Sequence, residues 1–259
     1  MVELDTKIRI GGITDMSTVD WYGNVSLVVF WAGCNIKCPY CHNSTLIPTD
    51  SGTEVNLYYL KDRLERGMYP VPSLDAVVFT GGEPLLQYEK VIEAAKLVKK
   101  YGLKIMMDTN GTLGEAAEKT LKTGLFDRVA LDVKSPLNKE AFGKLSGVPN
   151  LAEEYVSSIK KTIKISKMLN IPVEARTTVA PGVSDREEYI RHIASELVDK
   201  IDVYYLQQFD NQGEILDPKL KEKDPPTKEH LIKLAEIALE QGVSRVYIKT
   251  RFEGLERIK

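Results

Sequence analysis

All three cysteines of the chain lie in one short loop, Cys34-Asn35-Ile36-Lys37-Cys38-Pro39-Tyr40-Cys41. Three thiolates at this spacing can reach a single soft metal centre, whereas a disulfide set would leave one thiol over. A zinc site needs a fourth ligand, and His42 follows Cys41 with no spacer, so it has little freedom to turn inward. The spacing therefore favours an iron-sulfur cluster with one iron left open, and a zinc-stabilised binding module is the non-enzymatic alternative.

The same loop carries a resemblance to a known family. Together with Gly33 before it and His42-Asn43 after it, the loop resembles the cluster motif of the radical S-adenosylmethionine (SAM) enzymes. The trailing Cys-His-Asn is most similar to the branch that activates glycyl radical enzymes. In that family the three cysteines bind a [4Fe-4S] cluster, whose fourth iron chelates the amino and carboxylate groups of SAM. The resemblance implies that the catalytic cluster ligands here are Cys34, Cys38 and Cys41.

A second motif, Thr80-Gly81-Gly82-Glu83-Pro84, follows directly after an apolar run with the length of a strand. Two adjacent glycines let the backbone approach a ligand closely and expose its amide and carbonyl groups. The motif resembles the Gly-Gly-Glu-Pro segment of radical SAM enzymes, which binds the amino group of SAM. A plain turn is the alternative, but the motif stands immediately beyond a strand and at the expected distance after the cysteines.

Carboxylates follow the next two apolar runs, in Asp108-Thr109-Asn110-Gly111 and in Ala130-Leu131-Asp132-Val133-Lys134. Both segments resemble those of the pyruvate formate-lyase activating enzyme group. The resemblance implies that Asp108 and Asp132 hold a monovalent cation near SAM, and that Asp132 and Lys134 line the SAM site. Oxygen ligands suit a hard cation, and an ammonium group can pair with a carboxylate. A simple turn-forming role is the alternative for Asp108.

Polar side chains alternate with apolar ones along residues 173–179, which places Glu174, Arg176 and Thr178 on one face of a strand. The activating group carries an arginine at the place of Arg176, and the resemblance implies that it contacts SAM. The alternative is an exposed edge strand whose polar face meets water.

A departure from the family pattern occurs at Phe209, where the pyruvate formate-lyase activating enzyme has a histidine that touches SAM. Gln207 or Gln208 is expected to serve instead, because a glutamine offers both a donor and an acceptor. The residues that the resemblance implies at the cofactor are Tyr40, His42, Gly81, Gly82, Glu83, Asp132, Lys134, Arg176 and Gln208.

The apolar or β-branched runs that must position these residues alternate with helical patterns. The expected strands lie at residues 27–31, 76–80, 103–107, 128–133, 173–179, 203–209 and 245–248. Repeated βα units build a parallel sheet with outer helices, and six or seven units fall short of a closed eight-unit barrel. We therefore expect an α/β fold of the incomplete (β/α)6 type, which the resemblance also implies; a doubly wound open sheet is the alternative.

Helix starts are marked as well, by a capping-box pattern at Ser184-Asp185-Arg186-Glu187 and by Thr227 as a candidate N-cap. Residues 1–24 resist assignment apart from a short strand at 8–13, and they are expected to form an N-terminal extension. Residues 25–259 are expected to form a single domain.

Bulk properties exclude several functional classes. A chain of 259 residues with 43% hydrophobic and 28% charged residues is typical of a folded globular protein. Its formal net charge of -2 gives no electrostatic reason to expect nucleic-acid binding. The absence of any apolar stretch of roughly 20 residues argues against a membrane span, and a cytoplasmic location is expected.

The resemblance implies a radical SAM oxidoreductase that works under anaerobic conditions. An electron from flavodoxin or ferredoxin enters the cluster, and SAM is cleaved to methionine and a 5'-deoxyadenosyl radical. In the activating branch this radical takes a hydrogen atom from a backbone glycine of a partner enzyme in a transient complex. Anaerobic ribonucleoside-triphosphate reductase is the first choice of partner. The second enzymatic reading is a small-molecule radical SAM enzyme, for example one that rearranges a pterin in deazapurine synthesis.

Overall fold

The computed structural model describes residues 2–259, which contain ten β-strands and seven α-helices. They form two compact units, each assembled from separate segments of the chain. Unit 1 comprises the chain up to Asn35 together with Thr45–Thr109 and Leu113–Val129. Unit 2 comprises Ile36–Ser44, Asn110–Thr112 and Ala130–Lys259. The cysteine loop is therefore divided, because Cys34 belongs to unit 1 whereas Cys38 and Cys41 belong to unit 2.

Unit 1 is built around a short parallel sheet in which β4 lies between β2 and β5. The strand β1 pairs antiparallel with β2 on one side and with β3 on the other. The central strands β2 and β4 are buried on both faces, as is typical of a parallel sheet covered by helices. The elements of unit 1 are β1 Lys7–Ser17, β2 Ser26–Trp31, β3 Thr53–Asn56, α1 Leu57–Met68, β4 Ala76–Gly81, α2 Tyr88–Lys99, β5 Lys104–Thr109 and α3 Gly114–Leu121.

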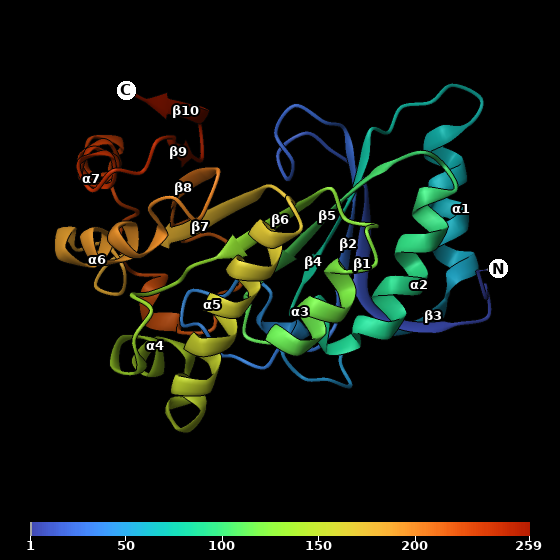
Figure 1. Cartoon of the computed structure of the whole chain (residues 1–259), viewed down its shortest axis with the longest axis horizontal. Helices are drawn as coiled ribbons and strands as arrows, with labels where there is room; N and C mark the ends of the chain where they lie inside the picture. Colours follow the sequence, from blue (N-terminus) through green and yellow to red (C-terminus); the bar gives the residue numbers. More distant parts are fainter. Residues whose placement is uncertain (1) are drawn as a thin grey trace. The chain divides into compact units, whose positions relative to one another are not determined.

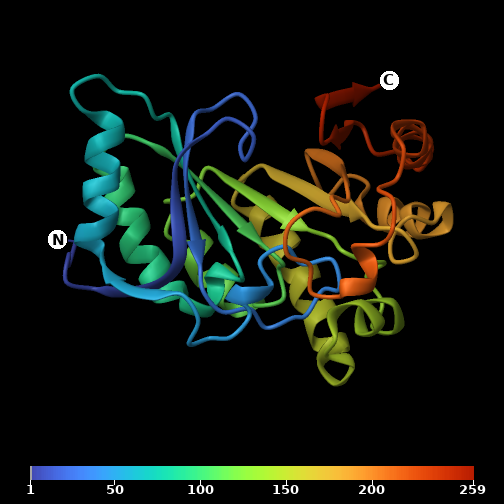
Figure 2. The ribbon, with the colours of Figure 1, turned by 180° about the vertical axis from the view of Figure 1, so that it is seen from behind.

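Unit 2 contains the parallel strands β7, β8 and β9, and β10 pairs antiparallel with β9. The strand β6 begins in unit 1 and ends in unit 2. Figures 1 and 2 show that the helices α6 and α7 lie beside these last strands. The elements are β6 Arg128–Asp132, α4 Lys139–Ser146, α5 Ala152–Met168, β7 Val173–Val179, α6 Glu187–Leu197, β8 Val203–Gln208, α7 Lys228–Glu240, β9 Val246–Thr250 and β10 Gly254–Ile258.

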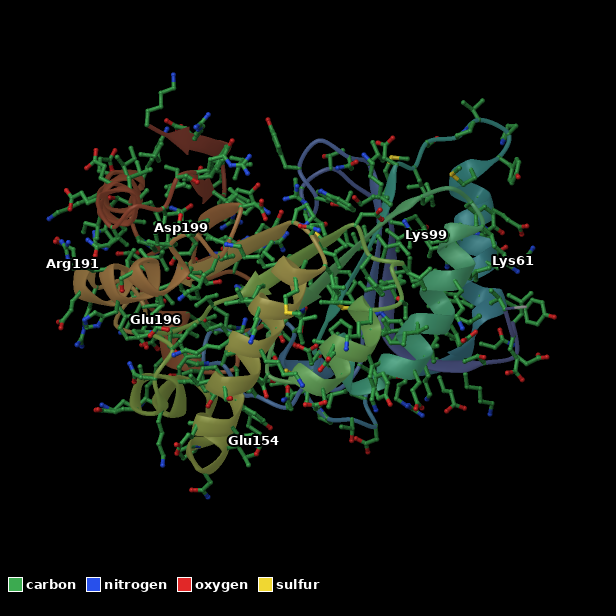
Figure 3. The ribbon with its side chains drawn as sticks, viewed as in Figure 1. Lys61, Lys99, Glu154, Arg191, Glu196 and Asp199 are labelled. Carbon is green, nitrogen blue, oxygen red and sulfur yellow. The ribbon has the colours of Figure 1, made fainter. Side chains whose placement is uncertain are left out.

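The helices present one apolar stripe to their sheets and charged side chains to solvent. In α6, for example, Ile190 and Leu197 are completely buried, whereas Arg191 is exposed. Figure 3 shows the labelled side chains Lys61 and Lys99 on the helices of unit 1, and Arg191 and Glu196 on α6 of unit 2. The polar residues of the predicted motifs therefore lie at the ends of the strands and not on the helix surfaces.

Two predicted helix starts have different outcomes. Thr227 caps α7 as expected, because its side chain accepts a hydrogen bond from His230 N at 3.2 Å. The capping box at residues 184–187 is wrong, because α6 begins after Arg186 without a side-chain cap. The Ser184 hydroxyl instead accepts a hydrogen bond from Ala180 N at 3.0 Å and donates one to Thr178 O, so it closes the turn after β7.

The predicted α/β class and all seven predicted strands are confirmed, as β2 and β4 to β9. The short strand expected at 8–13 is part of the longer β1, which pairs with β2. The strands β3 and β10 were not expected. The boundary at residue 25 and the single-domain organisation beyond it stay predictions. No helix within residues 2–259 has the length and apolar character needed to cross a membrane.

Candidate cluster and SAM site

The first cysteine is fixed by backbone hydrogen bonds within unit 1. β2 ends at Trp31, and the chain then turns so that Gly33 N donates to Leu46 O at 2.8 Å and Cys34 N donates to Ile47 O at 2.9 Å. These bonds hold the main chain around Cys34 without using its thiol.

The other two cysteines are fixed in the same way within unit 2. Cys41 N donates to Cys38 O at 3.0 Å, which closes a tight turn between the two residues. Lys37 N donates to Ser146 O at 2.7 Å, so the loop is tied to the end of α4. On its other side, Asp217 N donates to Pro39 O at 2.8 Å. The loop is thus held in place by main-chain hydrogen bonds.

The three cysteines are reduced, and their side chains are at least partly buried. None of the three cysteines, all of which the structure describes, forms a disulfide. Burial raises the pKa of the Cys41 thiol, so a soft metal centre would be needed to hold it as a thiolate at neutral pH. Within residues 2–259 no group of three or more His, Cys, Asp and Glu side chains is arranged to hold a metal ion. The assignment of the cluster therefore rests on the motif and on the chemistry of the donor set.

The Gly-Gly-Glu-Pro motif packs directly on the backbone around Cys34, inside unit 1. Gly82 N donates to Trp31 O at 2.8 Å, and Glu83 N donates to Gly33 O at 2.7 Å. A Cβ atom at Gly82 would lie 2.1 Å from Gly33 O, and one at Gly81 would lie 2.3 Å from Trp31 N. Gly81 also has a φ of 120°, which L side chains rarely adopt. Both glycines are required because the two backbone segments touch.

The Glu83 carboxylate is completely buried and binds groups of its own unit. It accepts hydrogen bonds from Leu85 N at 3.1 Å and from Thr109 Oγ1 at 2.7 Å. The neighbouring Asp108 accepts a bond from Thr80 Oγ1 at 2.8 Å. Glu83 therefore braces the motif against the end of β5, a role that the sequence did not indicate, and Asp108 is tied to the end of β4.

In unit 2, Lys134 and Asp132 form an ion pair with 2.5 Å between Nζ and Oδ2. Burial alone would lower the pKa of Lys134, but the neighbouring Asp132, Cys38 and Tyr40 outweigh it and raise this pKa well above its usual value. The ammonium group therefore stays charged. These contacts bring the strand-end pair predicted from the sequence next to the cysteine loop of the same unit.

Tyr40 stands beside this ion pair and is 5% exposed. Its hydroxyl group is buried and has no hydrogen-bond partner among the described residues. Burial raises the pKa of the phenol well above its usual value, although Lys134 opposes the shift, so the hydroxyl remains a neutral donor. A buried donor without a partner is costly and marks a place where a ligand can complete the bonding.

Arg176 lies on β7 and is held by Glu174, two residues before it on the same face. Arg176 Nε donates to Glu174 Oε1 at 2.7 Å, and Nη2 contacts the same oxygen atom. The side chains of Arg176 and Glu174 are 11% and 3% exposed, respectively, so this is a buried ion pair. The alternative of an exposed edge strand is wrong, because β7 pairs with β8 on one side, Val133 N donates to Arg176 O at 2.8 Å on the other, and the polar side chains of Arg176 and Glu174 are buried.

The two glutamines of β8 lie on opposite faces. Gln207 is paired with Thr178 in register and shares the face of Arg176. Gln208 uses its amide elsewhere, because Nε2 donates to Pro226 O at 2.8 Å and Oε1 accepts from Arg251 N at 2.9 Å. Gln207 is thus the better placed of the two for a ligand beside Arg176.

His42 and Phe209 pack together, with 6.3 Å between their ring centroids. Phe209 is 1% exposed and supplies an apolar wall at the end of β8. The end of β8 is thus in contact with the cluster loop of the same unit through these two rings.

These observations fit a cluster with SAM bound to it. The donor set is three cysteines on a loop held by its main chain, and the glycine motif brings a second backbone segment against the first of them. The orphaned Tyr40 hydroxyl beside the charged Lys134 offers polar groups that a ligand with a carboxylate and an amino group can use.

Comparison with known proteins decides the family. The family model described as the radical SAM superfamily matches residues 28–194, which is well over half of the chain. The chain belongs to the radical SAM superfamily. Its cofactors are accordingly a [4Fe-4S] cluster and SAM, and the radical SAM protein is an enzyme.

Full-length relatives place this radical SAM protein in the activating branch. A candidate glycyl-radical enzyme activating enzyme of Methanocaldococcus jannaschii is 36% identical over 94% of this chain and 97% of its own. The pyruvate formate-lyase 1-activating enzyme of Escherichia coli K12 is 32% identical over 70% of this chain and 71% of its own. Among solved structures, a radical SAM methyltransferase of Sphaerobacter thermophilus superposes with a TM-score of 0.70 at 15% identity, covering 89% of this chain and 67% of the other. This likeness confirms the predicted radical SAM partial-barrel fold.

The roles of three residues could not be assigned from the sequence alone. Glu174 was seen only as one of three alternating polar residues, although a carboxylate two positions from an arginine on one strand face signals an ion pair. Thr109 was part of a quoted motif but had no role until its bond to Glu83 appeared. Gln207 could not be ranked above Gln208 until the register of β8 against β7 was known.

Proposed function

We propose that this enzyme installs a glycyl radical on a partner enzyme. The observation that carries the proposal is the match to the Methanocaldococcus jannaschii candidate activating enzyme, which extends over 97% of that protein. The trailing Cys-His-Asn of the cluster loop supports it, because this triplet resembles the corresponding residues of the activating branch.

The roles of the residues follow from their chemistry. Cys34, Cys38 and Cys41 hold the cluster, and the backbone of Gly81 and Gly82 receives the amino group of SAM. When bound, the reduced cluster and SAM supply the 5'-deoxyadenosyl radical that removes a hydrogen atom from the substrate. Glu83 keeps the glycine backbone in place through Leu85 and Thr109, so it positions the motif rather than touching SAM.

On the side of unit 2, Lys134 pairs with a carboxylate of the ligand while Asp132 holds the ammonium group in position. Tyr40 donates its unpartnered hydroxyl, and the guanidinium group of Arg176, fixed by Glu174, contacts SAM. Gln207, on the face of Arg176, takes the place that the sequence analysis gave to Gln208. His42 packs against Phe209 and supports the loop behind the cysteines.

A monovalent cation near SAM is a further part of the proposal. Asp108 at the end of β5 and Asp132 at the end of β6 supply carboxylate oxygens, which hard cations prefer. Activity that depends on the identity of the added monovalent cation, and that loses this dependence in Asp108→Asn, supports the site.

The electron donor that we propose is a flavodoxin or a ferredoxin. A cavity of about 560 Å³ in unit 2 is lined by Pro39 of the cysteine loop and by Lys144 and Arg186. The same cavity is also lined by Glu140, Glu188 and Asp217, and Lys144 pairs with Glu140 at 2.8 Å, so the resemblance to the activating branch, and not the charge of the cavity, supports this donor. Anaerobic ribonucleoside-triphosphate reductase is the first candidate for the partner, met in a transient complex.

The test is to reduce the reconstituted enzyme with SAM present and to add the anaerobic ribonucleotide reductase of the same source. We expect a doublet glycyl radical signal in electron paramagnetic resonance together with a stoichiometric amount of 5'-deoxyadenosine. If 5'-deoxyadenosine forms only when a small metabolite is supplied and the reductase never acquires a radical, the small-molecule reading replaces this one.

A further inference from the structure

A second cavity of unit 2 lies in the groove between α5 and the carboxyl end of α6. Its volume is about 430 Å³, which is within the range of small-molecule sites. The two helices are bridged there by an ion pair, with 3.2 Å between Lys160 Nζ and Glu196 Oε2. Figure 3 labels Glu196 on α6 and Asp199 in the turn that follows this helix. The predicted cluster and SAM residues, all of which the structure describes, do not line this cavity.

Three apolar side chains line the cavity. Leu137 comes from the segment between β6 and α4, and Ile163 comes from α5; both are buried. Met168, the last residue of α5, also lines the cavity but is 70% exposed. Covering an exposed apolar side chain is favourable, because the ligand and the side chain both leave water. The lining therefore favours a ligand with an apolar body.

The cavity is also lined by cations. Four lysine side chains contribute to it, namely Lys160, Lys164, Lys167 and Lys200. Glu196 is the one acidic residue that lines it within residues 2–259. Lys160, Lys164 and Lys167 follow each other at spacings of four and three residues, so they lie on one side of α5. An apolar hollow is thus bordered by ammonium groups along a single helix.

The partners of these cations identify the charge that is left for a ligand. Lys167 donates to the main-chain carbonyl of Asp199, and Lys200 Nζ donates to Glu196 O at 2.6 Å. Asp199 and Asp202 line a neighbouring cavity together with Lys167 and Lys200, so they balance these two lysines in part. Lys164, in contrast, forms no ion pair with any residue that the structure describes. Its ammonium group is the cation that an anionic ligand can pair with.

The cavity and the predicted site motif lie on different sides of α5. Thr162 is completely buried, and its Oγ1 donates to Gly111 O at 3.1 Å, within the same unit. Lys164 on the same helix is exposed. A ligand in the cavity therefore does not occupy the place of SAM.

We propose that this cavity binds a free amphiphilic anion, a small molecule with an aliphatic or aromatic body and one carboxylate or phosphate group. The apolar body lies against Leu137, Ile163 and Met168, and the anionic group pairs with Lys164. The charge of the cavity differs in sign from that of the whole chain, which is -2. This binding site does not depend on the proposed function, because it uses none of the residues assigned to the cluster or to SAM.

The experiment titrates the reconstituted enzyme with three probes in a calorimeter, below the concentration at which the probes form micelles. Octanoate has both parts of the expected ligand, 1-octanol has only the apolar body, and acetate has only the charge. We expect octanoate to bind at least about 10-fold more tightly than either of the others, because only octanoate gains both the apolar contact and the ion pair. Saturating SAM should leave its Kd unchanged, and added salt should raise it.

Two variants separate the two parts of the site. Lys164→Gln should raise the Kd for octanoate about 10-fold and leave that for octanol unchanged, because only the ion pair is lost. Met168→Ser should weaken both probes to a similar extent, because only apolar contact is lost. Both positions are exposed, so the fold should be kept, which circular dichroism checks. The control is Lys221→Gln, an exposed lysine of unit 2 outside this cavity, and it should bind both probes as the parent does.

Four outcomes would overturn the proposal. The first is an absence of saturable binding of octanoate, and the second is binding that Lys164→Gln and Met168→Ser leave unchanged. Displacement of octanoate by SAM would place the probe in the SAM site instead. Sedimentation of the enzyme with vesicles of phosphatidylglycerol, lost in Lys164→Gln and seen without binding of octanoate, would assign the cations to a membrane surface. None of these outcomes bears on the installation of a glycyl radical.

Discussion

The predicted site residues of unit 1 and those of unit 2 are stabilised by different kinds of interaction. In unit 1 the Gly81-Gly82 backbone lies against the backbone of residues 31–34, and the buried carboxylate of Glu83 accepts hydrogen bonds from Leu85 N and Thr109 Oγ1. In unit 2 the corresponding groups are charged pairs, Lys134 with Asp132 and Arg176 with Glu174. The unit 1 residues are positioned by close backbone contact, and the unit 2 residues are positioned by buried ion pairs.

This difference predicts how the residues of each unit respond to substitution. A backbone that cannot move fixes the position of a group but adds no net charge, whereas paired charges can exchange partners when a charged ligand arrives. The unit 1 side should therefore be sensitive to added volume. The unit 2 side should be sensitive to the loss of a single charge.

The largest expected effect is the loss of Arg176 from the charged side. Arg176→Met keeps the length of the side chain but leaves Glu174, with a side chain 3% exposed, without its cation. Removing one partner of a buried pair costs about 3–5 kcal/mol of unfolding free energy. Urea denaturation measures this loss.

The matched control is Arg191→Met on α6, labelled in Figure 3, which pairs with Glu240 at 3.7 Å on the surface. An exposed pair contributes about 0–1 kcal/mol, so the control should change stability little. Equal losses in the two variants would show that the Arg176 pair is not the buried contact described above.

The next largest effect is expected from added volume on the backbone-built side. In Gly82→Ala the new Cβ would lie 2.1 Å from Gly33 O, and a backbone atom cannot step aside cheaply. We expect a loss of about 1–3 kcal/mol in stability and a loss of SAM binding that exceeds it, because the motif must shift from Cys34.

Gly67→Ala in α1 is the control for that substitution, since its Cβ would meet only the Leu74 side chain, at 2.4 Å, and alanine favours the helix. Chemical denaturation and equilibrium dialysis with SAM report both quantities. Normal SAM binding in Gly82→Ala would remove the close approach as the reason for the second glycine.

A smaller effect is expected when one charge is removed beside the cysteine loop. Lys134→Ala and Asp132→Asn should keep the cluster absorption spectrum and weaken SAM binding by about 1.5–3 kcal/mol, the contribution of a charge-assisted contact. The pKa of Lys134 is raised, so the ammonium persists to higher pH than usual. The difference in SAM affinity between Lys134→Ala and the parent should accordingly stay constant up to about pH 10.4, where an ordinary lysine is half deprotonated. A difference that vanishes at the upper end would contradict the raised pKa.

The smallest effect separates the two roles of Tyr40. In the SAM-free protein Tyr40→Phe removes a buried hydroxyl without a partner among the described residues, so stability should stay equal or rise by up to about 1 kcal/mol. SAM binding should weaken by about 1 kcal/mol if the hydroxyl completes its bonding there. Thermal unfolding with and without SAM measures both changes. A loss of stability without SAM would reveal a partner for the hydroxyl within the protein.

The parallel strands and the cluster motif could be predicted because their signals are local. Runs such as residues 76–80 are apolar throughout, and the three cysteines with their glycine motif stand at characteristic spacings. The strands β3 and β10 were missed because they are short and mainly exposed, so neither shows a clear alternation of buried and exposed residues. Their pairing is decided by neighbours far along the chain.

The finer parts of the site depend on register and on which atoms a side chain meets. Gln207 and Gln208 are adjacent and chemically identical, and only the pairing of β8 with β7 distinguishes their faces. Ser184 matched a capping box, but its hydroxyl bonds within the turn after β7. Glu83 carries a carboxylate that could bind a ligand, but its hydrogen bonds to Leu85 and Thr109 hold the glycine motif in place. Sequence supplied the chemistry of these groups, and tertiary contacts assigned their partners.

The division of the cysteine loop has a consequence for how the enzyme is made. Residues 36–44 belong to unit 2, but most residues of that unit lie much later in the sequence, from Ala130 to Lys259. At roughly 5–20 residues per second, a ribosome needs on the order of 5–20 seconds to pass from the loop to Ala130. The main-chain partners of Lys37 and Pro39, at Ser146 and Asp217, emerge later still. Two of the three thiols thus leave the ribosome well before the contacts that shape their loop exist. We expect iron-sulfur assembly factors to load the cluster after synthesis is complete, when the loop has its final form.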